Sequence, residues 1–170
     1  MQPPDVTLRP MRDSDARMHQ GFPPTAEINR MYGGDPARLP QATAQRSAEW
    51  LAWMRSQPYA RVIEADKSAV GAVRLHNLSE DGREAWLAIG LFADRFLARG
   101  IGRRAIRLAL DQGRDGMGLR AVSLKVLAYN TRAIHCYRAC GFVHIQTVPA
   151  GLTLDGRPQD DWIMRITFSQ

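Results

Sequence analysis

The segment from Glu84 to Ala128 limits most strongly what this chain can fold into. An apolar stretch of strand-favouring residues, Glu84 to Phe92, is followed by Gly100-Ile101-Gly102 and then by apolar residues at helical spacing. A second strand-like run, Ala121 to Ala128, alternates apolar and polar residues after this helix. Strand, helix and strand in this order predict a parallel crossover within one sheet, so we expect an α/β protein.

The rest of the chain supplies further elements for a single domain that covers residues 1–170. With 170 residues and a hydrophobic content of 45%, the chain can bury one core, and no repeat or linker divides it. Residues 21–40 are rich in Pro and Gly and predict a long loop or a broken helix. Helices are predicted near residues 16–19, 42–55, 100–118 and 131–137. Strands are predicted at residues 6–9, 59–65, 69–75, 84–92, 121–128, 142–148 and 161–168.

Composition argues against several classes of protein. No run approaches the roughly 20 apolar residues that span a bilayer, and residues 1–10 lack a signal-peptide pattern, so we expect a cytoplasmic protein. Cys136 and Cys140 are the two cysteines, and we expect both to be reduced thiols. The histidines show no metal-binding spacing, so no metal is expected.

The glycine turn before the third predicted helix is suited to an anion. A strand that runs into a helix directs unpaired backbone N–H groups and the positive end of the helix dipole at one spot. Gly100 and Gly102 remove side chains that would keep a diphosphate off this backbone. The pattern fits neither a P-loop nor a dinucleotide-binding turn, and a tight turn that only allows close helix packing stays an open interpretation. Five arginines surround the turn: Arg95, Arg99, Arg103, Arg104 and Arg107.

A second motif lies downstream of this turn. Residues 130–142 read Asn-Thr-Arg-Ala-Ile-His-Cys-Tyr-Arg-Ala-Cys-Gly-Phe. They resemble the Asn-x-x-Ala-x-x-x-Tyr-x-x-x-Gly-Phe signature of the GNAT superfamily of acyl-CoA-dependent N-acetyltransferases. Gly100-Ile101-Gly102 is similar to that family's (Gln/Arg)-x-x-Gly-x-(Gly/Ala) turn, except that Leu97 stands where the family has Gln or Arg. Two motifs in the right order, with a helix and a strand between them, favour the resemblance over chance.

The resemblance covers nearly the whole chain. Residues 6–15 are similar to the opening of the branch that contains ribosomal-protein N-terminal acetyltransferases and spermidine acetyltransferase, and residues 154–164 to its closing hairpin. It implies the GNAT fold, a mixed and mostly antiparallel sheet of about seven strands flanked by about four helices. The strands that end near Phe92 and Ala128 are expected to splay apart, and a bulge at Gly90 would help to open them.

The resemblance also implies that acetyl-CoA binds in this gap. The pantetheine arm is expected beside the backbone that follows Gly90, and the diphosphate at the glycine turn. Leu97 would remove one side-chain contact and leave the backbone cradle intact. The residues expected to bind the cofactor are Leu91, Phe92, Ala93, Arg99, Gly100, Ile101, Gly102, Arg103, Arg104, Asn130, Ala133 and Tyr137.

The implied reaction is transfer of the acetyl group to a primary amine by direct attack in a ternary complex. Tyr137 matches the family's tyrosine near the CoA sulfur, where its hydroxyl can protonate the departing thiolate. Glu84 is the candidate general base, since alternation puts it on the same strand face as Trp86. A solvated carboxylate at the start of a strand is the alternative interpretation of Glu84. Backbone N–H groups near Leu91 are the candidates for stabilising the oxyanion.

Two other functions stay open. One is a domain of the same fold that binds acyl-CoA without catalysis, as a sensor or scaffold. The other, suggested by the net charge of +6, is nucleic-acid binding, which is less favoured because the arginines gather at a glycine turn rather than among aromatic residues. The acceptor is expected to be a protein or peptide N-terminus, a polyamine or an aminoglycoside, with Glu27, Asp35 and Asp155 available to attract it. No nucleic-acid or membrane partner is expected, and a homodimer is left open.

Overall fold

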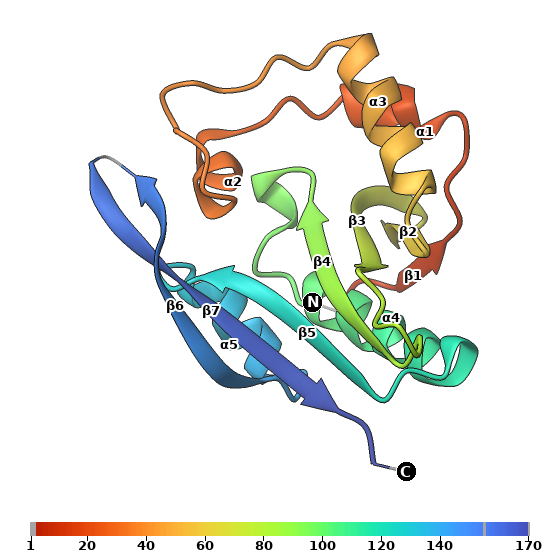
Figure 1. Ribbon diagram of the computed structural model, residues 1–170. Helices are drawn as coiled ribbons and strands as arrows, with labels where there is room; N and C mark the ends of the chain where they lie inside the picture. Colours follow the sequence, from red (N-terminus) through yellow and green to blue (C-terminus); the bar gives the residue numbers. More distant parts are fainter. Residues whose placement is uncertain (1–2, 155, 170) are drawn as a thin grey trace.

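The computed structural model describes residues 3–154 and 156–169, and it arranges them around one mixed sheet (Figure 1). The seven strands have the order β1-β2-β3-β4-β5-β7-β6, and the β4–β5 pair is parallel while the other neighbours are antiparallel. The predicted fold is therefore confirmed, with five α-helices where about four were expected. The elements are β1 (Val6–Arg9), α1 (Asp15–Gln20), α2 (Ala26–Met31), α3 (Ala44–Arg55), β2 (Tyr59–Ala65), β3 (Ser68–His76), β4 (Glu84–Leu91), the 3-10 turn η1 (Asp94–Phe96), α4 (Ile101–Met117), β5 (Ala121–Leu127), α5 (Thr131–Arg138), β6 (Val143–Leu154) and β7 (Arg157–Thr167).

The long helix α4 packs on one face of the sheet, while α1 and α3 lie on the other (Figure 1). The buried stripe of α4 faces Val73 and Leu75, which alternate along β3 with residues that point to the opposite face. This stripe includes Ile106 and Leu110, whereas Gln112 is exposed. Two layers of helix around one sheet thus build the scaffold that holds β4 and β5.

β4 and β5 pair only at their beginnings. Residues 84–86 lie opposite residues 121–123, whereas β4 continues to Leu91 and β5 to Leu127. Beyond this short ladder the two strands separate, and each stays extended because it pairs with its other neighbour, β3 or β7. This is the splay that the resemblance implied.

The predicted bulge at Gly90 is absent from the β3–β4 ladder. The register runs without a shift from Gly71 opposite Leu91 to His76 opposite Trp86. The glycine is needed for space instead, because a Cβ built on Gly90 would collide with the Tyr32 hydroxyl.

The last hairpin is longer than the sequence indicated. β6 was expected to end at Val148, because Pro and Gly follow it, yet the strand continues to Leu154. The register jumps from Val148 opposite Asp161 to Leu152 opposite Gln159, so a bulge absorbs residues 149–151. A proline is tolerated there because β6 lies at the edge of the sheet. Asp155, one of the acidic residues expected near the acceptor, lies outside the described residues.

A buried ion pair fixes the N-terminal strand to α1 and β2. The Arg9 guanidinium donates two hydrogen bonds to the Asp15 carboxylate, at 2.8 and 2.9 Å, and a third to Glu64 at 2.6 Å. The backbone N–H of Arg12 donates to Asp15 at 2.7 Å. Burial alone would raise the pKa of Asp15, but these hydrogen bonds outweigh it and lower that pKa. The side chain of Asp15 is 1% exposed, so the pair is a buried one.

We predict that Asp15→Asn lowers the free energy of unfolding by about 3 kcal/mol, because the buried Arg9 guanidinium loses one of its two carboxylate partners and keeps only Glu64. Because the folded-state pKa of Asp15 is depressed, its contribution is complete above about pH 4 and is lost as the pH falls further. Urea unfolding at pH 7 and at pH 3 measures both effects. Asp13→Asn is the control, since Asp13 is 95% exposed in its pair with Arg55 and should leave the midpoint unchanged. Equal unfolding midpoints for the two variants at pH 7 would refute this assignment.

Candidate functional site

The splay leaves backbone groups of β4 without a strand partner. Phe92 donates its N–H to the Val70 carbonyl at 2.9 Å, so the polar groups of Phe92 face β3. In an antiparallel pair the alternate residues direct N–H and C=O away from the partner strand. Ile89 and Leu91 therefore direct theirs toward β5, where the ladder has already ended. Of the expected cofactor-binding residues of β4, Leu91 faces the gap, and the N–H of Phe92 is already bonded.

The glycine turn has a conformational requirement at Gly100. This residue has φ +78°, in the left-handed region, and a Cβ built on it would meet nothing within 4 Å. Its role is therefore set by backbone conformation and not by lack of space. Gly102 differs, because a Cβ there would lie 3.8 Å from the sulfur of Cys136, an ordinary contact with α5. Ala98 also has a positive φ, of 56°, which makes this a strained turn.

The N-terminus of α4 presents uncapped backbone donors. The first intrahelical bond runs from the Arg104 N–H to the Gly100 carbonyl at 3.1 Å. The N–H groups of residues 101–103 precede it, and no side chain caps them within the described chain. A helix of 17 residues adds its dipole at the same place. This end of α4 is therefore suited to bind a phosphate or diphosphate.

The five arginines near this turn fall into two groups. Arg95 lies over the Phe96 ring at 4.6 Å from its centroid, and Arg107 donates to the Ala139 carbonyl at 3.0 Å. Those two side chains hold the turn and α5 in place. The other three guanidinium groups are exposed and form no hydrogen bond or ion pair with any described residue, so they are available to an anion: Arg99, Arg103 and Arg104.

Asn130 begins α5 as its N-cap. The side-chain oxygen accepts from the Ala133 N–H at 3.2 Å, and the side-chain nitrogen donates to the Met31 carbonyl at 3.4 Å. Both ends of the amide are therefore used within the protein. A contact from this side chain to pantetheine would have to replace the weaker bond to Met31.

Tyr137 lies on α5 with its ring 6.0 Å from that of Phe142. Its hydroxyl has no hydrogen-bond partner among residues 3–154 and 156–169. Burial raises the pKa of Tyr137 above its usual value, and the neighbouring phenol of Tyr32 adds to the rise. The hydroxyl therefore stays protonated at neutral pH and can donate its proton to a ligand.

Glu84 lies apart from the other predicted site residues. Its carboxylate accepts two hydrogen bonds from the Arg165 guanidinium, at 2.7 and 3.0 Å, and these bonds lower its pKa. It is also seven residues before Leu91, which is roughly 20 Å along an extended strand, at the end where β4 and β5 are paired. The alternation of residues along β4 identifies the face on which Glu84 lies, but it cannot show which end of β4 separates from β5. Glu84 therefore links β4 to β7, and its position does not suit a base in the splay.

The helix α2 connects the separated ends of β4 and β5. From its C-terminal end the Tyr32 hydroxyl donates to the Ile89 carbonyl at 2.9 Å, one of the groups that face the gap. On the other side Glu27 pairs with Arg132 of α5 at 3.0 Å. Tyr32 is 63% exposed as a residue, yet its hydroxyl is the part that packs on β4, and desolvation there raises its pKa to about 12. The sequence offered one signal for this contact, the glycine inside β4.

An aromatic cavity of about 390 Å³ lies between α3 and the segments on either side of α2. Its lining includes His19, Trp50 and Trp53. The His19 ring stacks on Trp50 with centroids 4.1 Å apart, and burial lowers the pKa of His19, which leaves it neutral at pH 7. Trp50 also meets Phe92 edge-on at 5.9 Å, so the cavity adjoins the end of β4. Trp50 and Trp53 therefore form part of the pocket wall.

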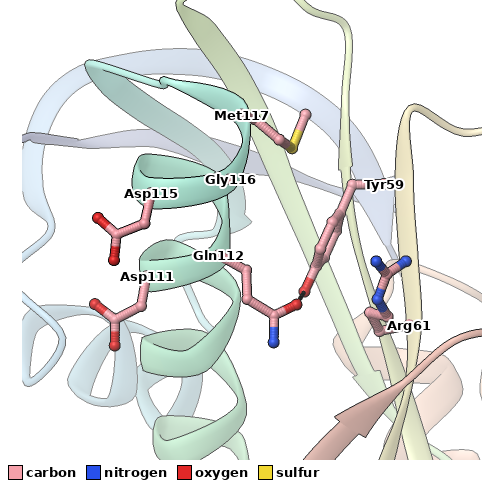
Figure 2. A pocket seen from close by; sticks show the side chains of 7 residues that line it. All are labelled: Tyr59, Arg61, Asp111, Gln112, Asp115, Gly116 and Met117. Atoms are coloured by element: carbon pink, nitrogen blue, oxygen red, sulfur yellow. Dashed lines mark hydrogen bonds between the residues drawn. The ribbon is translucent and has the colours of Figure 1, made fainter.

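A larger hollow of about 550 Å³ lies beside the C-terminal half of α4, at Tyr59 (Figure 2). There Tyr59 donates its hydroxyl proton to the side-chain oxygen of Gln112 at 2.7 Å. Asp111 and Asp115 point away from Tyr59 (Figure 2). Arg114 pairs with both of them. Because the polar groups that line this hollow do not point toward one another, we place the candidate site at the splay between β4 and β5.

Among the described residues, no group of three or more His, Cys, Asp or Glu side chains is arranged to hold a metal ion. No described helix has both the length and the apolar character that crossing a membrane requires.

Known proteins share this sequence pattern and fold. The family model for the acetyltransferase (GNAT) domain matches residues 5–143. Spermidine N(1)-acetyltransferase of Escherichia coli K12 is 29% identical over 138 residues, which are 81% of this chain and 72% of that protein. The Vibrio cholerae serotype O1 enzyme of the same name is 31% identical over 99 residues, which are 58% of this chain and 57% of that protein. The crystal structure of V. cholerae spermidine N-acetyltransferase in complex with CoA and spermine has a TM-score of 0.78 and 25% identity, with 95% of each chain covered.

We predict that Gly100→Val weakens CoA binding about tenfold or more. A β-branched residue at φ +78° costs about 1–2 kcal/mol or shifts the turn, and either effect moves the backbone donors at the start of α4. Isothermal titration calorimetry with CoA measures the change in Kd. Gly116→Val is a matched control, because that glycine of α4 also has open space around it but no positive φ. If both variants bind CoA as the parent protein does, the turn does not hold the donor.

Proposed function

Because the chain belongs to the GNAT acetyltransferase family, we propose that its amine substrate attacks acetyl-CoA directly, in one ternary complex at the splay. The overall reaction, acetylation of an amine with acetyl-CoA as donor, follows from the family match and the spermidine N-acetyltransferase relatives. The observation that carries the proposal is the early end of the β4–β5 ladder, since it leaves a strand-shaped gap beside unpaired backbone.

In this proposal the donor is held mainly by backbone. The diphosphate of acetyl-CoA binds the N–H groups at the start of α4, with Arg99, Arg103 and Arg104 adding charge. The pantetheine arm lies in the gap and bonds to the main chain of Leu91, as an added strand would. Support comes from the uncapped helix terminus and from the direction of the Leu91 backbone groups. Leu97 is half-buried and takes no part in this cradle.

The chemistry then needs two proton movements. A neutral amine attacks the thioester carbonyl, a C–N bond forms, and the backbone N–H of Leu91 is suited to stabilise the oxyanion. The C–S bond then breaks, and we assign Tyr137 as the acid that protonates the departing thiolate. The proton that the attacking nitrogen loses as it becomes an amide returns to the Tyr137 oxygen. The free, protonated hydroxyl of Tyr137 supports this role.

The amine must lose its own proton before it attacks. Since Glu84 is bound to Arg165 at the paired end of β4, we assign the deprotonation of the amine to water in the splay rather than to that carboxylate. Turnover should then rise with pH as the free amine fraction rises. Tyr32 is unsuited as a base, because its raised pKa keeps it protonated.

The alternative of a sensor or scaffold that binds acyl-CoA without catalysis is not favoured, because the named relatives are enzymes. The cytoplasmic location, the single domain over residues 1–170 and the lack of nucleic-acid and membrane partners remain proposals. A homodimer also remains a proposal. The best candidate surface for it is the outer edge of β6, where Val143 and Ile145 are 61% and 53% exposed.

We predict that Tyr137→Phe lowers kcat by roughly 10 to 1000 fold, the range expected for loss of a general acid. The Kd for acetyl-CoA should change little, because the diphosphate and pantetheine contacts remain. Release of free thiol from acetyl-CoA, with spermidine and other primary amines as acceptors, measures kcat. Tyr59→Phe is the matched control, since its hydroxyl bonds Gln112 away from the splay. An unchanged kcat for Tyr137→Phe at saturating substrate removes Tyr137 from the mechanism.

A further inference from the structure

Arg74 carries a positive charge that the protein itself does not pair. Its guanidinium stacks on the Trp53 ring at 4.3 Å, and its Nε is buried without a hydrogen-bond partner. No described residue forms a hydrogen bond or ion pair with this side chain. Burial lowers the pKa of Arg74, yet an arginine remains charged at neutral pH. A half-buried, unpaired guanidinium is costly unless something else supplies an anion.

Arg74 lies on the face of the sheet away from α4, beside the part of β4 that has separated from β5. In β3 it lies opposite Ala88 of β4. Its charge opposes part of the rise in the pKa of Tyr32, whose hydroxyl lies on β4 next to the gap. Trp53, on which it stacks, also lines the aromatic cavity. The guanidinium thus lies between the end of α2, the open face of β4 and that cavity.

Two of the acidic residues expected to attract a cationic acceptor, Glu27 and Asp35, are occupied elsewhere. Glu27 is held by Arg132 at 3.0 Å. Asp35 accepts from the Ala37 N–H at 2.8 Å, in its own loop. A polyamine carries only positive charge, and it would meet the unpaired Arg74 on this surface. Among the residues that line the cavity the carboxylate is Glu49, which accepts a hydrogen bond from Gln45.

We propose that the amine accepted by this enzyme also carries a carboxylate, as an α-amino acid does, and that Arg74 binds this carboxylate. The planar fork of arginine matches a carboxylate with two parallel hydrogen bonds. With the carboxylate at Arg74, the amino group can face the thioester near Tyr137, and an apolar side chain can enter the aromatic cavity. This inference rests on the proposed acetyltransferase function and deepens it by naming the class of acceptor.

The aromatic lining indicates which amino acids to test first. The cavity wall includes Phe22, Trp50 and Trp53, and His19 beside them is neutral at pH 7. A cavity of about 390 Å³ accommodates one large apolar side chain. We therefore choose phenylalanine as the probe, with phenethylamine as the same molecule without the carboxylate and spermidine as the polycation.

The test compares thiol release from acetyl-CoA with these three amines for the parent enzyme, Arg74→Gln and Arg74→Lys. The parent enzyme should use phenylalanine at least about tenfold better, in kcat/KM, than phenethylamine or spermidine. Arg74→Gln should lower kcat/KM for phenylalanine about 10 to 100 fold and that for phenethylamine less than about twofold, as expected for one charged hydrogen-bonded pair. Arg74→Lys keeps the charge without the planar fork of arginine, so its kcat/KM for phenylalanine should lie between the values for the parent enzyme and for Arg74→Gln. Arg61→Gln is the control, because Arg61 stacks on Tyr59 away from the cleft and should behave as the parent.

A binding measurement separates this inference from the proposed function. N-acetylphenylalanine is titrated into the CoA-loaded enzyme, and its affinity should fall about tenfold or more in Arg74→Gln, whether or not turnover is seen. Thiol release from spermidine in preference to phenylalanine, or equal losses for phenylalanine and phenethylamine in Arg74→Gln, would overturn the inference while the acetyltransferase function stands. Arg74-dependent binding without thiol release from any amine would support the inference and contradict the proposed reaction.

Discussion

The site depends on one backbone interaction that ends early, the parallel ladder between β4 and β5. It stops at Trp86 and Ser123, while β3 and β7 keep both strands extended beyond that point. A buried peptide group without a partner costs about 1–3 kcal/mol. The gap therefore favours a ligand that carries amides of its own and can lie along a strand, which describes the pantetheine arm of CoA.

The net charge of +6 can be interpreted by asking where the arginines lie relative to this gap. At the donor end, the N-terminus of α4 and three unpaired arginines favour a diphosphate. Other cations serve structure, as Arg9 does with Asp15 and Arg165 with Glu84. Arg74 belongs to neither set, and this distinction makes it informative about the acceptor. The same residue type thus has three roles here, which composition alone cannot separate.

Much of the fold could be predicted from the sequence, because the central strands are short runs of apolar, strand-favouring residues and α4 buries one face at helical spacing. The glycines at 100 and 118 also mark both ends of α4, and both adopt the left-handed conformation. The site was less predictable. Alternation could not tell which end of β4 opens, and the structure places Glu84 at the paired end, against Arg165. Tyr32 follows a segment without a period, and its contact with Ile89 spans 57 residues. Arg74 sits inside a regular strand, where nothing in the sequence shows that it lacks a partner.

The most direct test of the account is a crystal structure of the protein with CoA bound. We expect the diphosphate on the N–H groups of residues 101–103, the pantetheine amides along Leu91, and the sulfur within hydrogen-bond reach of the Tyr137 hydroxyl. A diphosphate bound away from the start of α4, or a sulfur far from Tyr137, would contradict the account.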